Sequence, residues 1–245
     1  MSKKSTARVL FLGILLTAEN LGLEALFKSL PDVIGFVIKV LILMGTFYLL
    51  IQVRYKIEIP ILSNLSAKEQ IKINWLTLLI IVLGCLPLLI QGMINYPSSL
   101  PDSLLYAMGS GIVCEYIFRG LFLQLALKDE NKTHKQILQA VFLSSACFAL
   151  VQSSPYWQES LSMILSQALY SLCIGIYAGA LAIRCGHIGW GILLHAMISF
   201  SGIQVTQSTL STPASLTVTP VLSVALLFFS LYLLRPAALS SDDDI

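Results

Sequence analysis

Residues 73–94 read INWLTLLIIVLGCLPLLIQGMI and contain no charged side chain. A transmembrane helix needs about 20 mainly apolar residues, so this stretch is long enough to cross a membrane. Seven other stretches have a similar length and composition. The predicted fold is therefore all-α, a polytopic membrane helix bundle of about eight transmembrane helices. The predicted spans are residues 8–28, 32–53, 73–94, 104–127, 136–152, 161–183, 187–205 and 218–234.

The composition of the whole chain agrees with this fold class. Of its 245 residues, 56% are hydrophobic and only 11% are charged, whereas soluble domains are about 25% charged. This excludes a soluble enzyme, a disordered protein and a coiled coil. The 15 Lys and Arg residues nearly balance the 13 Asp and Glu residues, so we expect membrane lipids and no nucleic acid as partners.

The positive residues predict the orientation of the bundle. With the N-terminus in the cytoplasm, 12 Lys and Arg residues fall in inner segments and only Lys28 falls in an outer one. This distribution follows the positive-inside rule and requires an even number of spans, so we expect both termini in the cytoplasm. Glu19, Asn20 and Glu24 interrupt the first apolar stretch, which we interpret as a retained span of one integral membrane domain over residues 1–245.

Several polar side chains are predicted to lie inside the membrane, where charged groups are rare and need a partner or a function. Glu115 and Arg119 are four residues apart, a spacing that puts them on one helix face. They form either an internal ion pair or part of a site. Gln152 lies on the fifth predicted span, and His195 and Ser199 lie on the seventh. Cys114, Gln152 and His195 lie at similar predicted depths on three spans, which indicates a buried site or a polar cavity. A lone His in such a helix is otherwise a packing residue.

Two further features concern helix packing. Gly175 and Gly179 form a GxxxG pattern in the sixth span, which is typical of closely packed membrane helices. Glu19 and Lys39 lie at matched depths in the first two spans, so we predict that they pair. The alternatives are that Lys39 extends to the headgroups or that Glu19 is protonated in lipid.

Three motifs in residues 100–205 resemble those of the CAAX-protease and bacteriocin-processing family of intramembrane endopeptidases. That family carries EExxxR, FxxxH and HxxxN or HxxxD, the last after a glycine-rich helix. This chain has CEYIFRG at 114–120, FALVQ at 148–152 and HAMIS at 195–199 after a glycine-rich lead. The resemblance implies an eight-helix bundle with a polar cavity open to the cytoplasm. It also places the protein in a membrane, for which we expect the bacterial plasma membrane.

The resemblance assigns roles to the motif positions. In the family, the first Glu and the FxxxH His are taken to activate a water, and the later His and Asn to stabilise the oxyanion. Three of these four positions are substituted here, by Cys114, Gln152 and Ser199, and only His195 remains. The supporting Glu115, Arg119 and Phe148 are retained, the last as the Phe of FxxxH.

These substitutions leave three functions open. The first is a degenerate, non-catalytic family member that binds or regulates another membrane protein or a lipidated peptide and needs no cofactor. The second is an active intramembrane endopeptidase with a rearranged site around Glu115, Arg119 and His195. It would use zinc, or Cys114 as a nucleophile with His195 as its base. The third is a small transporter, for which no inverted repeat is visible.

Overall fold

The computed structural model describes residues 3–60, 63, 65–128, 133–154, 159–207 and 213–236, with helices and no β-strand in these ranges. The predicted all-α class is confirmed. Three helices contain a π-helical part and continue through it, so the described residues form eight continuous helical segments. These are α1 (Lys3–Leu26), α2 (Asp32–Leu49) with η1 (Leu50–Tyr55), α3 (Ala67–Ile80) with η2 (Ile81–Cys85) and α4 (Leu86–Asn95), α5 (Leu100–Glu115) with η3 (Tyr116–Phe122) and α6 (Leu123–Ala126), α7 (His134–Ser153), α8 (Leu161–Cys185), α9 (Gly189–Gln207) and α10 (Pro213–Leu233).

Local sequence signals begin and end several of these helices. Ser66 and Thr133 each accept a hydrogen bond from the backbone N–H three residues later, and the Glu or Gln at that position bonds back, which is a capping box at the start of α3 and of α7. After α8, Gly186 adopts a left-handed conformation (φ 68°) that ends the helix.

Each helical segment overlaps one predicted span. Five segments are long and apolar enough to cross a membrane, namely residues 4–26, 32–55, 67–95, 134–153 and 161–185. Large apolar side chains such as Phe11, Leu41, Leu83 and Leu165 are exposed on their outer surfaces. This is the pattern of helices that face lipid, because a soluble surface rarely exposes so much apolar area. Eight crossings with cytoplasmic termini remain a prediction.

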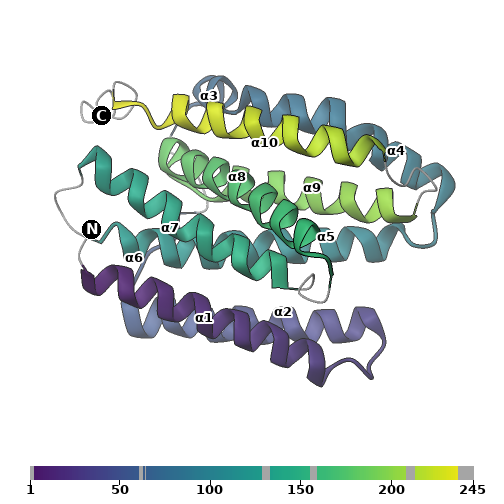
Figure 1. Ribbon diagram of the computed structural model, residues 1–245, viewed down its shortest axis with the longest axis horizontal. Coiled ribbons are helices and arrows are strands. Elements are labelled where there is room, and N and C mark those ends of the chain that lie inside the picture. Colours follow the sequence, from purple (N-terminus) through teal and green to yellow (C-terminus); the bar gives the residue numbers. More distant parts are fainter. Residues whose placement is uncertain are drawn as a thin grey trace.

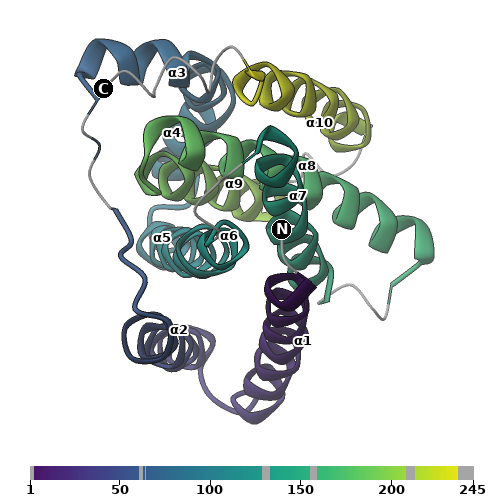
Figure 2. The same cartoon turned by 90° about the vertical axis from the view of Figure 1, so that its left-hand side faces the viewer.

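The helices lie along the long axis of the molecule (Figure 1). Seen end-on, α5, α7, α8 and α9 occupy the middle, α3, α4 and α10 lie on one side, and α1 and α2 lie on the other (Figure 2). Among the closest pairs are α5 with α9 and α7 with α8. Glycines allow both approaches. A Cβ at Gly111 would lie 2.9 Å from the backbone oxygen of Ile192, and a Cβ at Gly175 would lie 2.9 Å from Cβ of Ser145.

The first hairpin corrects one prediction. Nζ of Lys39 lies 3.9 Å from Oε2 of Glu24, whereas Glu19 accepts a hydrogen bond of 3.3 Å from the Thr46 hydroxyl. The pairing of Lys39 with Glu19 was therefore wrong. Side chains on a helix point towards its N-terminus, so the long Lys39 side chain points towards the turn between α1 and α2. It therefore reaches Glu24, which is nearer that turn than Glu19.

Candidate functional site

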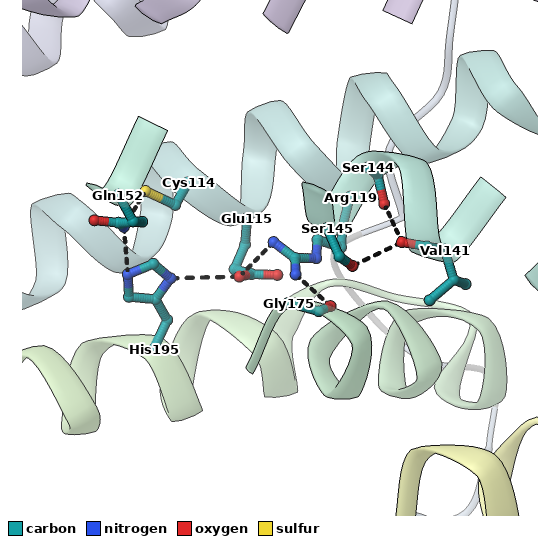
Figure 3. A network of polar contacts seen from close by, with 9 residues as sticks. All are labelled: Cys114, Glu115, Arg119, Val141, Ser144, Ser145, Gln152, Gly175 and His195. Atoms are coloured by element: carbon teal, nitrogen blue, oxygen red, sulfur yellow. Dashed lines mark hydrogen bonds and ion pairs between the residues drawn. The ribbon is translucent and has the colours of Figure 1, made fainter. Parts of the chain in front are cut away.

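A chain of polar contacts crosses the middle of the bundle and joins three helical segments (Figure 3). Cys114 and Glu115 are the last residues of α5, and Arg119 follows one turn later in η3. Gln152 projects from α7 and His195 from α9. The structure therefore brings together five of the residues that the sequence singled out, at a common depth. The contacts run in the order Cys114, Gln152, His195, Glu115, Arg119.

The ion pair forms the most buried part of this chain. Nη1 of Arg119 lies 3.2 Å from Oε1 of Glu115, and both residues are 0% exposed. The Arg119 guanidinium also donates through Nη2 to the backbone oxygen of Gly175, and its Cζ lies 5.0 Å from the centre of the Phe148 ring. Arg119 therefore links η3 to both α7 and α8. A contact with the ring face adds attraction for the cation.

His195 lies between the ion pair and the amide of Gln152. Its Nδ1 is 3.4 Å from Oε1 of Glu115, and its Nε2 is 3.4 Å from Nε2 of Gln152. The same Gln152 nitrogen donates to Sγ of Cys114 over 3.5 Å. One arrangement satisfies all three contacts: neutral His195 donates from Nδ1 to Glu115, and the two amide hydrogens of Gln152 point to His195 and Cys114.

The opposite orientation of the Gln152 amide fits these contacts less well. A flipped Gln152 amide would need a doubly protonated His195, which would add a second positive charge beside one buried carboxylate. An unbalanced buried charge costs several kcal/mol. The neutral form keeps Glu115 and Arg119 as a balanced pair. In that form the only lone pair of the imidazole already accepts a hydrogen bond from Gln152.

A glycine on α9 makes room for the carboxylate. A Cβ on Gly191 would lie 2.6 Å from Oε2 of Glu115. That oxygen has no hydrogen-bond partner among the described residues. Gly191 could not be singled out from the sequence, since nothing in its local pattern distinguishes it from the other glycines of the lead to His195.

The remaining motif residues lie around this chain of contacts. The Phe148 ring packs edge-on against His195 with centroids 5.3 Å apart. Gly175 and Gly179 face α7, and a Cβ on Gly179 would lie 3.0 Å from Cγ1 of Val141. Ser199 lies one turn after His195 on α9, half-buried and outside the chain of contacts.

An inner cavity of about 170 Å³ reaches Cys114 and Gln152. On its other side it is lined by α1 and α2, including Asn20, Glu24 and Lys39. A role for these residues in the site could not be predicted from the sequence, because helix rotation decides which residues of the first hairpin face α5. The cavity therefore places polar side chains from outside the three motifs opposite Cys114 and Gln152.

The donor set does not match a zinc site. A catalytic zinc usually has three protein ligands from His, Cys, Asp or Glu. In the part of the chain that the structure describes, no three such side chains are grouped to hold a metal ion. Glu115 is engaged by Arg119 and His195, and the amide of Gln152 separates His195 from Cys114.

Comparison with known proteins agrees with the motif resemblance. The family model described as "Type II CAAX prenyl endopeptidase Rce1-like" matches residues 96–201, a range that contains all five residues of the polar chain. No curated protein and no solved structure matches the chain significantly.

Proposed function

We propose that this protein, whose residues 96–201 belong to the Rce1-like type II CAAX prenyl endopeptidase family, does not cleave peptides. It is an integral multi-pass membrane protein of that family. In the proposed function it binds another membrane protein or a lipidated peptide and regulates or protects it. The bacterial plasma membrane is the proposed location.

The observation that carries this proposal is the position of the Gln152 amide. A hydrolytic site needs a group that accepts a proton from water near neutral pH, and an amide does not titrate. Gln152 also donates towards Nε2 of His195, the nitrogen that would otherwise act as the base. The negative charge of the Glu115 carboxylate is balanced by the Arg119 guanidinium. Of the five residues in the polar chain, only Cys114 and Gln152 line the inner cavity, with a thiol and an amide. The Glu24 carboxylate across the cavity lies 3.9 Å from Lys39, and this set of groups supports binding better than hydrolysis.

A cysteine peptidase is the rival that the geometry addresses most directly. Its nucleophile would need Nε2 of His195 within hydrogen-bond reach of Sγ of Cys114. Instead, one nitrogen of Gln152 contacts both atoms, at 3.4 Å from Nε2 and 3.5 Å from Sγ. The amide would have to move away before the thiol could transfer its proton. We therefore propose the binding function first.

The test uses the purified full-length protein in lipid vesicles with a fluorogenic prenylated peptide. We expect the same background cleavage for the wild type and for His195→Ala, and saturable binding of the peptide to both. The matched gain-of-function variant is Cys114→Glu with Gln152→His and Ser199→Asn, which restores the family pattern. Cleavage by the wild type that His195→Ala abolishes, in a variant with an unchanged melting temperature, would refute the proposal.

A further inference from the structure

A second, larger cavity opens at one end of the bundle. This vestibule has a volume of about 1140 Å³, which is the size of a pocket for a small molecule or a short peptide. It lies where α1 ends, where α2 and α5 begin, and where α7 ends. That end of the bundle is opposite the end where α1 begins and α10 ends (Figure 1).

The vestibule connects to the polar chain of the candidate site. Three residues line both the vestibule and the inner cavity, namely Glu24, Phe36 and Lys39. They form a neck between the open end of the bundle and the space beside Cys114. Lys39 and Glu24 are 3.9 Å apart, and about half of the Glu24 side chain is exposed. This ion pair balances the charge of Lys39 at the neck.

The side chains that line the vestibule favour the binding of a cation. Asp32 and Asp102 line the vestibule, with Lys28 as the opposing charge. Phe36 and Tyr106 also line it, with ring centroids 4.4 Å apart. Aromatic rings attract organic cations through their faces, and carboxylates add charge attraction. Lys39 and Glu24 balance each other, so Asp32, Asp102 and Lys28 leave the vestibule with one net negative charge.

Ser103 is a separate sign of a ligand. It lines the vestibule and is only 2% exposed. Its hydroxyl has no hydrogen-bond partner among the residues that the structure describes. A buried hydroxyl without a partner is unfavourable, and a ligand with a polar group would satisfy it. Acidic residues in the first turn of a helix also stabilise that helix, but that role requires neither the aromatic pair nor the orphan hydroxyl.

We infer that the vestibule is a binding site for an organic cation, an ammonium or guanidinium group that lies between Asp32 and Asp102 against the aromatic pair. The group could belong to a small amine or to a basic side chain of a peptide. With the termini in the cytoplasm as predicted, this site is reached from the opposite side of the membrane. The resemblance implied a cavity open to the cytoplasm, so the inferred access differs from it.

The experiment measures how fast a cysteine in the vestibule reacts with charged thiol reagents. Ala25 lines the vestibule and is exposed, so Ala25→Cys is the reporter, in a Cys114→Ala background. The other four native cysteines are buried. Ser98→Cys is the matched control, because Ser98 is exposed at the same end and does not line the vestibule. Both are modified with cationic and anionic methanethiosulfonates of similar size.

We expect the ratio of the cationic to the anionic reaction rate to be roughly sevenfold higher at Ala25→Cys than at Ser98→Cys, as one net negative charge at an assumed separation of roughly 7 Å in water predicts. The preference should fall towards the control value in about 1 M salt. It should also fall with Asp32→Asn and Asp102→Asn combined. Equal rates for the two reagents at low salt, or a preference for the anion, would overturn the inference.

Protection by ligands tests the site without altering its carboxylates. Tetramethylammonium and a short arginine peptide are added separately before the reagent. We expect at least one of them to slow labelling of Ala25→Cys several-fold and to leave Ser98→Cys unchanged, and the stronger protector identifies the source of the cation. Protection by neither would overturn the inference.

In intact cells, a membrane-impermeant cationic reagent should label Ala25→Cys from outside, and labelling only in inverted vesicles would contradict the inferred side of access.

Discussion

Replacing Arg119 by Met removes one partner of the buried ion pair and keeps much of the side-chain volume. Arg119 is 0% exposed and contacts Glu115, the backbone oxygen of Gly175 and the Phe148 ring. The variant leaves the Glu115 carboxylate buried with His195 as its remaining polar partner. It also removes the hydrogen bond from the Arg119 guanidinium in η3 to the Gly175 carbonyl in α8.

The magnitude follows from the uncompensated charge. Breaking a buried ion pair by removing one partner costs about 3–5 kcal/mol. Soluble proteins of this length lose roughly 2–4 °C of melting temperature per kcal/mol, which corresponds to a loss of roughly 6–20 °C. Removing both charges at once leaves no isolated charge. The double variant Glu115→Gln with Arg119→Met should therefore be more stable than Arg119→Met alone.

The assay is thermal unfolding in a mild detergent, followed by the amount of monodisperse protein that remains. The wild type, Glu115→Gln, Arg119→Met and the double variant form a double-mutant cycle. We expect a coupling free energy above about 1.5 kcal/mol between the two positions, because residues in one ion-pair network do not behave additively. Additive losses, or an Arg119→Met variant as stable as the wild type, would show that the pair does not hold the helices together.

Two further predictions concern helix packing. Gly191→Ala should lower the free energy of unfolding by about 1–3 kcal/mol, because its Cβ would lie 2.6 Å from Oε2 of Glu115. The control Gly202→Ala lies on the same helix with open space around it, so its melting temperature should be unchanged or higher. Equal losses in both variants would contradict the assigned contact. Cysteines at Glu24 and Lys39 should crosslink faster with a short bifunctional reagent than cysteines at Glu19 and Lys39, and the reverse order would contradict the arrangement of the first hairpin.

The positions of the helices could be predicted from the sequence because bilayer thickness sets the length of each apolar run. The predicted span 32–53 corresponds to the helical segment Asp32–Tyr55, and the span 161–183 to Leu161–Cys185. The convergence of Cys114, Gln152 and His195 was also predictable, since residues at the same depth of antiparallel helices can meet. Depth follows from counting residues along a helix at about 1.5 Å each.

The rotation of each helix about its axis could not be predicted in the same way. It depends on which side chains pack against which, and on close approaches such as that of Gly191 to Glu115. Rotation also decides that Lys39 faces α5 and lines the inner cavity. The direction of a side chain along its helix caused the remaining error, the pairing of Lys39 with Glu19. The vestibule joins residues at or near the ends of five helices, so no single stretch of sequence could reveal it.

The proposed non-catalytic function and the retention of the buried pair are compatible on energetic grounds. Replacing a buried ion pair by apolar residues of similar volume can be neutral or stabilising, but removing either charge alone is strongly destabilising. In the proposed function, Gln152 stands at the family's His position and leaves the buried pair intact. Loss of Arg119 alone would instead leave the Glu115 carboxylate isolated and destabilise the fold. The Glu115–Arg119 pair is therefore expected to persist in a protein that binds rather than cleaves, and its presence is not an argument for hydrolysis.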